Sequence, residues 1–182
     1  MRNEVGIRLV SLHCTCTSVD LRRHRTDTRP PRRPRPSRTQ HENARTFAAG
    51  RDELTGMHGN TALALMLGAQ KRYEVTGEAH FAALTRRFYE LVVGSRTYAT
   101  GGSTHNELWE TPGHLGHTLG GHSGLRHEHA ESCTTHNMVR LVGMLLRASG
   151  GALVYAEFIE RALLNAVMGT QRGAEPGAML YF

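Results

Sequence analysis

The 182-residue sequence lacks any uninterrupted apolar run near the ~18 residues that a membrane-spanning helix needs, so we expect no membrane span. It has three cysteines, too few for the disulfide framework of a small secreted fold. The first residues do not form the apolar stretch of about 7–15 residues that marks a secretory signal, because Arg8 and His13 interrupt it. Stability must therefore come from packing, and nothing at the N-terminus supports secretion.

Charge is distributed unevenly along the chain. Residues 1–50 hold 11 Arg and 4 acidic residues, whereas residues 51–182 hold 11 Lys+Arg and 12 acidic residues. Four of the six prolines lie in the same basic segment, at positions 30, 31, 34 and 36. Charge repulsion, missing backbone donors and the absence of an apolar period predict that residues 1–47 are a disordered tail. Residues 48–182 are long enough for one ordered domain.

The tail fits three functions. Clustered arginines suit a nucleic-acid-binding arm, an Arg-rich and acid-poor composition suits an organelle transit peptide, and Pro-x-x-Pro spacing suits a ligand of SH3-type domains. None of these patterns is specific. We favour a solvated extension, or a misplaced start of the reading frame, over all three. The compartment and the oligomeric state are not readable from the sequence.

Apolar residues recur at helical spacing in four segments, which are 60–76, 81–92, 138–145 and 155–167. Gly77 and Gly94 follow the first two segments and are predicted to end them. Gly150-Gly151 separates the last two. Short connections between partners predict two antiparallel helix hairpins and an all-α fold, which suits a bundle, a solenoid or a toroid.

The segment between Gly94 and Glu131 has no helical period and is unusually long for a loop, so we interpret it as functional. It places Glu107 beside Trp109, the only tryptophan. An apolar neighbour raises the pKa of a carboxyl group toward the range of a general acid. Glu107 is therefore the acid/base candidate, although spacing alone favours a surface Glu beside a packed Trp.

Glu131 and Cys133 stand two residues apart at the start of a predicted helix. Zinc accepts carboxylate oxygen and thiolate sulfur together, so the two side chains are candidate ligands. Two ligands do not complete a site. Other possible donors are loop histidines whose spacing matches no standard zinc module and which we expect to be solvated: His114, His117, His122, His127 and His129.

The last residues combine a predicted turn at Glu175-Pro176-Gly177 with a predicted strand at Ala178–Phe182. The strand has no partner after it. We therefore expect the protein to continue beyond residue 182.

Four blocks of the sequence carry a family resemblance: HGNTALALMLGAQKRYEVTGE (58–78), TYATGGSTHNELW (97–109), ESCTTHNMVRL (131–141) and YAEFIERALLNAVMGTQRGAEPGAMLYF (155–182). In order and spacing they resemble the β-L-arabinofuranosidase-like glycoside hydrolases of family 127, especially the plant-type members. The resemblance runs from about Ala48 to Phe182, and residues 1–47 show none. It is most specific in the ESCTT–HNM and ERALLN–QRG blocks.

The resemblance implies a fold and a set of roles. The family is an (α/α)₆ toroid followed by β-domains, so the two hairpins would be part of a toroid. Glu107 resembles the general acid/base, His58 resembles a sugar-contacting histidine, and Tyr181 aligns with a tyrosine of the substrate pocket. Glu131 and Cys133 resemble two zinc ligands. The other two are adjacent cysteines farther downstream, one of which is the nucleophile.

We therefore expect a partial glycoside hydrolase domain with the acid/base and half of the zinc site, directed at an arabinofuranoside-type carbohydrate. It would be inactive alone, since Cys14 and Cys16 precede the motifs and are no replacement for the nucleophile. The alternative is a non-catalytic helical module that binds carbohydrate, or nucleic acid through its basic tail. A purely structural helical protein is the third possibility.

Overall fold

A computed structural model describes residues 51–119 and 128–181. Its helices are α2 (Gly59–Thr76), α3 (Ala79–Ser95), the single turn α4 (Leu115–Thr118), α5 (Ser132–Ala148) and α6 (Leu153–Ala162). A π-helical turn (Leu163–Val167) and a 3₁₀ turn (Met168–Thr170) extend α6. The described residues contain isolated β-bridges but no strand, which confirms the all-α prediction. The predicted disorder of residues 1–47 concerns positions outside the described residues.

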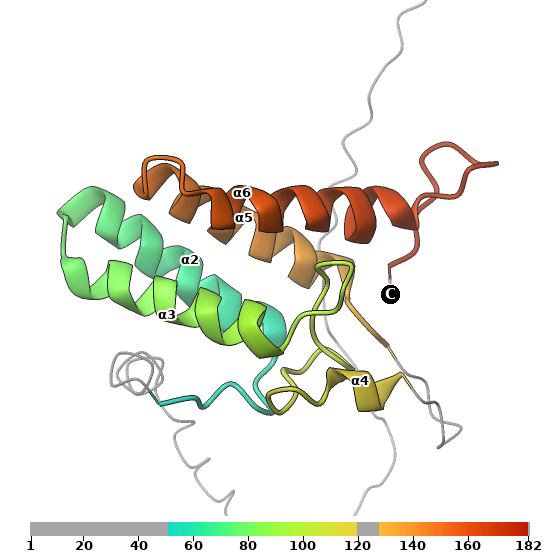
Figure 1. Cartoon of the computed structure of the whole chain (residues 1–182), viewed down its shortest axis with the longest axis horizontal. Helices are drawn as coiled ribbons and strands as arrows, with labels where there is room; N and C mark the ends of the chain where they lie inside the picture. Colours follow the sequence, from blue (N-terminus) through green and yellow to red (C-terminus); the bar gives the residue numbers. More distant parts are fainter. Residues whose placement is uncertain (1–50, 120–127, 182) are drawn as a thin grey trace, which may run out of the picture. The chain divides into compact units, whose positions relative to one another are not determined.

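The four long helices form two antiparallel hairpins, α2 with α3 and α5 with α6, and α2 packs against α5 (Figure 1). Tyr89 links the outer helices, because its ring lies 4.9 Å from that of Tyr155 and its hydroxyl donates to the carbonyl of Val154 at 3.0 Å. The contacts of α2 with α3 and of α5 with α6 confirm the predicted pairing into hairpins. Within the described residues, no helix is both long and apolar enough to cross a membrane.

One hydrophobic core joins the two hairpins. Its fully buried members come from all four long helices and include Leu63, Phe88, Met138 and Phe158. Trp109 enters the same core from the long loop: it is 1% exposed and packs edge-on against Phe88, with 5.9 Å between ring centres. The loop that follows α3 is therefore anchored by its tryptophan.

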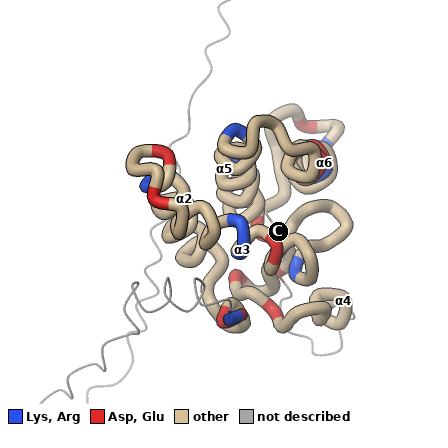
Figure 2. The backbone as a smooth tube through the Cα atoms, turned by 60° about the vertical axis from the view of Figure 1, so that its left-hand side comes forward, with Lys and Arg blue, Asp and Glu red and all other residues tan. Residues whose placement is uncertain are grey.

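Charged residues are interspersed by sign along the described backbone (Figure 2). Several form exposed pairs three residues apart, such as Lys71 with Glu74 and Arg87 with Glu90. Pairs of this kind contribute little stability and mark solvated helix faces.

One predicted helix end and one predicted strand are wrong. Gly94 lies inside α3, because the helix ends where the backbone N–H of Arg96 still bonds the carbonyl of Val92. The predicted strand at Ala178–Phe182 does not form within residues 178–181. A strand needs a row of backbone partners, whereas this segment makes one bridge, between Gln171 and Met179, and is otherwise held by single hydrogen bonds.

Arg96 fixes the end of α3 through a buried guanidinium group. Its side chain is 1% exposed, its Nη2 donates to Asp52 at 2.7 Å and its Nε donates to the carbonyl of Glu110 at 2.7 Å. A buried cation requires such partners, because an unpaired charge in the interior is strongly unfavourable. Arg96 therefore ties together α3, the segment before α2 and the loop that carries Trp109.

Replacing Asp52 with alanine is expected to lower the free energy of unfolding by about 3 kcal/mol, since it leaves the Arg96 guanidinium buried without a counter-charge. Urea denaturation would measure the change. The matched control is Glu175→Ala, which removes an exposed pair with Arg172 and should change stability by less than about 1 kcal/mol. Equal effects of the two substitutions would contradict the structural role of Arg96.

Candidate functional site

The sequence-predicted site residues gather around the first turns of α2 and α5. Gly59 allows these turns to approach closely: a Cβ atom there would lie 2.8 Å from Thr104 Cγ2 and 3.1 Å from Thr134 Oγ1. Any larger side chain would have to displace the loop or α5. The residues on either side of Gly59, which are His58 and Asn60, make the contacts that build the site.

Glu107 lies at the tip of a tight turn. His105 and Leu108 exchange backbone hydrogen bonds of 3.0 Å, and the two central residues have positive φ, 48° for Asn106 and 66° for Glu107. This is the type I′ arrangement, in which glycine is favoured at the second central position. A left-handed φ costs a residue other than glycine ~1–2 kcal/mol, so Glu107 occupies its position at the expense of stability.

Backbone hydrogen bonds place this turn beside the start of α2. The N–H of Gly59 donates to the carbonyl of Glu107 at 2.8 Å, and the N–H of Trp109 donates to the carbonyl of Met57 at 2.9 Å. The side chains of His58 and Glu107 consequently meet, with 3.1 Å between His58 Nε2 and Glu107 Oε2. Their side chains are 39% and 36% exposed, so both can be reached by a ligand.

Glu131 and Cys133 form the second group of the site. Asn60 Nδ2 lies 2.8 Å from Cys133 Sγ and 3.4 Å from Glu131 Oε2, while the Tyr181 hydroxyl lies 2.8 Å from Glu131 Oε1 and 3.0 Å from Cys133 Sγ. The N–H of Ser132 donates to the carbonyl of Tyr181 at 2.9 Å and fixes that residue at the start of α5. The carboxylate and the sulfur therefore face the same donors.

Glu131 and Cys133 carry two donor types that zinc accepts, a carboxylate oxygen and a sulfur. Glu131 is 4% exposed, and in the described part of the chain its carboxylate meets neutral donors and no basic side chain. Burial raises the pKa of the Cys133 thiol, a direction that the neighbouring Glu131 reinforces and the Tyr181 hydrogen bond opposes. A bound divalent cation would supply the missing positive charge and hold the sulfur as thiolate. Among residues 51–119 and 128–181, no three His, Cys, Asp or Glu side chains converge as a complete set of ligands.

The loop histidines do not complete this set within the described residues. His129 Nδ1 hydrogen-bonds with the hydroxyl of Tyr98 at 3.1 Å, and the ring centres of His114 and His117 lie 5.3 Å apart with the rings tilted by 45°. The remaining candidates, His122 and His127, lie outside the described residues.

Two contributors were not predicted from the sequence. Asn60 was interpreted as the start of a helix, but its side chain reaches across to α5. Asn137, on α5, donates its Nδ2 to Asn60 Oδ1 at 2.9 Å. Both lie in the blocks HGN and HNM that carry the family resemblance, and this was the available signal.

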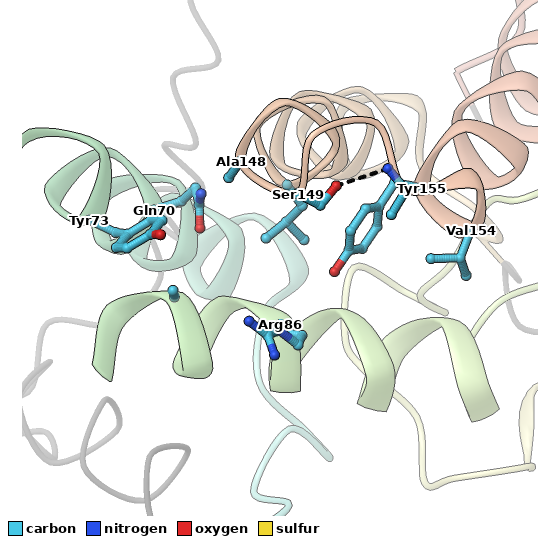
Figure 3. A pocket seen from close by; sticks show the side chains of 10 residues that line it. Gln70, Tyr73, Arg86, Ala148, Ser149, Val154 and Tyr155 are labelled. Carbon is cyan, nitrogen blue, oxygen red and sulfur yellow. Dashed lines mark hydrogen bonds between the residues drawn. The ribbon is translucent and has the colours of Figure 1, made fainter. Parts of the chain in front are cut away.

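A separate pocket of about 300 Å³ lies where the two hairpins meet, toward the C-terminal ends of α2 and α5. Figure 3 shows Gln70 and Tyr73 on one side of it and Tyr155 on the other. The amide of Gln70 is buried, and its Nε2 has no partner in the described residues. The predicted site residues do not line this pocket, so it is distinct from the candidate site.

Replacing Glu107 with glycine is expected to raise the free energy of unfolding by about 0.5–1 kcal/mol, because relief of the left-handed φ exceeds the added entropy of the unfolded chain. The half-exposed pair with His58 contributes little to stability. Glu107→Ala removes the same carboxylate but keeps a Cβ atom, so it should show no gain. Thermal denaturation of both variants checks this, and a gain shared by alanine would assign the effect to the side chain instead of the backbone.

A search of curated proteins found no match. The chain matches the family described as Beta-L-arabinofuranosidase, GH127 catalytic domain, over residues 22–182. The match includes every residue of the candidate site and begins inside segment 1–47, where the motif blocks showed no resemblance. The all-α hairpins correspond to that family's α/α toroid, and the chain belongs to the GH127 β-L-arabinofuranosidase catalytic-domain family of glycoside hydrolases.

Proposed function

We propose that this site serves the hydrolysis of β-L-arabinofuranosides, with Glu107 as general acid/base and with His58 and Tyr181 in contact with the sugar. The observation that carries the proposal is the presence of two carboxylates in different environments near the start of α2. One, Glu107, is accessible and paired with a histidine, and the other, Glu131, is buried beside a thiol. Two carboxyl groups in different environments suit two different roles.

Glu107 has the exposure that an acid/base residue needs. Hydrolysis with retention requires one carboxyl group to protonate the leaving glycosidic oxygen and then to accept a proton from the attacking water. His58 engages Oε2 of Glu107, and the carboxyl group would use Oε1 toward the substrate. The type I′ turn supports the same role, since strained backbone is typical of functional residues.

Glu131 and Cys133 would hold a zinc ion. Two chemical facts support this assignment. Zinc accepts both donor types, and the buried carboxylate of Glu131 has no basic partner among the described residues. A bound zinc ion would keep coordinated sulfur deprotonated and therefore nucleophilic. His58 and Tyr181 would orient the sugar, and Glu107 would transfer the proton.

The nucleophile implied by the resemblance is one of two adjacent cysteines. The cysteines of these 182 residues are Cys14, Cys16 and Cys133, and no two of them are adjacent. We therefore propose that these residues contribute the acid/base and two metal ligands, and that they do not complete catalysis by themselves.

Zinc binding by the chain is expected to be weak and to depend on Cys133. Closed four-ligand sites hold zinc with apparent free energies of ~10–16 kcal/mol, and two protein ligands should fall well short of this. Competition with a chromophoric chelator would measure the affinity. Cys133→Ser should abolish binding, whereas the Cys14→Ser, Cys16→Ser double variant should bind like the wild type. Binding that survives Cys133→Ser would place the metal on the loop histidines.

No measurable hydrolysis of an aryl β-L-arabinofuranoside is expected from the 182-residue chain. General acid catalysis by Glu107 contributes ~10²–10⁴-fold, and glycoside hydrolysis also needs a nucleophile. The assay uses the purified chain with added zinc and reductant, and Glu107→Gln is the control. Turnover that disappears in Glu107→Gln would overturn this expectation. Saturable binding of the sugar without turnover would favour a carbohydrate-binding role.

A further inference from the structure

One side chain, that of Asn60, touches both proposed metal ligands. Asn60 Nδ2 lies 2.8 Å from Cys133 Sγ and 3.4 Å from Glu131 Oε2, so its two N–H hydrogens can each serve one of the two acceptors. Asn60 belongs to α2, whereas both acceptors lie at the start of α5. The amide therefore spans the junction between the two hairpins.

The orientation of this amide matters. An asparagine side chain turned by 180° would present its oxygen to the carboxylate and the sulfur, and oxygen would repel both. Asn137 prevents this, because its Nδ2 donates to Asn60 Oδ1 at 2.9 Å. Arg140, which has only donors, contacts Asn137 Oδ1 through Nη1 at 3.3 Å and fixes that amide in turn. Arg140 thus sets the orientation of the Asn137 amide, and Asn137 in turn sets the orientation of the Asn60 amide.

We propose that Asn60, oriented by Asn137, is a positioning residue that aims Glu131 and Cys133 at one divalent cation. Asn60 would not bind the cation, because the atom that it presents to Glu131 and Cys133 is Nδ2, which offers no lone pair. Donors that orient metal ligands in this way typically change metal affinity by about 10–100-fold when they are removed. The inference rests on the proposed metal site at Glu131 and Cys133.

The test measures Co²⁺ binding to the full 182-residue chain by the sulfur-to-cobalt charge-transfer absorption, with Zn²⁺ as competitor. Asn60→Ala is expected to weaken binding by about 10–100-fold, and Asn137→Ala by a smaller factor. The matched control is Asn165→Ala, which removes an exposed amide that donates to the carbonyl of Arg161 at 3.0 Å and should leave affinity unchanged. Far-ultraviolet circular dichroism checks that each variant folds.

The double variant separates positioning from a general loss of structure. If Asn137 acts through Asn60, then Asn137→Ala should cause no further loss in the Asn60→Ala background, whereas independent effects would add. Additive losses, or wild-type affinity in Asn60→Ala, would overturn the positioning role of Asn60 and leave the proposed metal site unaffected. If Cys133→Ser holds Co²⁺ as tightly as the wild type in competition with a chromophoric chelator, the proposed metal site and this inference both fail. Should Asn60→Ala not fold, Asn137→Ala against Asn165→Ala decides the question.

Discussion

The close approach of the first turns of α2 and α5 is the constraint on which the candidate site depends. It is possible because position 59 has no side chain, and a Cβ atom there would lie within 3.1 Å of Thr104 and Thr134. From this junction His58 reaches the Glu107 turn and Asn60 reaches Cys133. One glycine at a helix start therefore lets the residues on either side of it reach partners that are far away in sequence.

The segments around the junction carry backbone strain that the helical core must offset. Thr104, Asn106, Glu107 and Ala130 all have positive φ, and a β-branched residue such as Thr104 is rarely found in that region. Trp109 holds the same loop in the core, next to the end of α3 that Arg96 fixes. Strained residues persist only where their surroundings determine them, and here the anchors lie on both sides of the turn.

Apolar spacing predicted the two hairpins because a helix that buries one face repeats its apolar residues every three or four positions. It did not predict that α3 continues through Gly94, since a buried Arg96 with partners distant in sequence decides where the helix ends. The type I′ turn lacked its usual glycine, so residues 105–108 gave no turn signal. Asn60 was missed for a related reason: its partners depend on how α2 and α5 pack, and periodicity carries no information about that contact.

Residues 51–119 and 128–181 contain two buried charged side chains, Arg96 and Glu131, and their surroundings are opposite in kind. Arg96 is neutralised by Asp52 at 2.7 Å, which is the arrangement expected when a buried charge serves the fold. Glu131 is equally inaccessible, yet its described partners are the neutral side chains of Asn60, Tyr181 and Thr134. Neutral donors offset only part of the desolvation of a carboxylate. A cation shared with Cys133 would supply the rest, so a metal ion at the proposed site would offset the desolvation of this carboxylate.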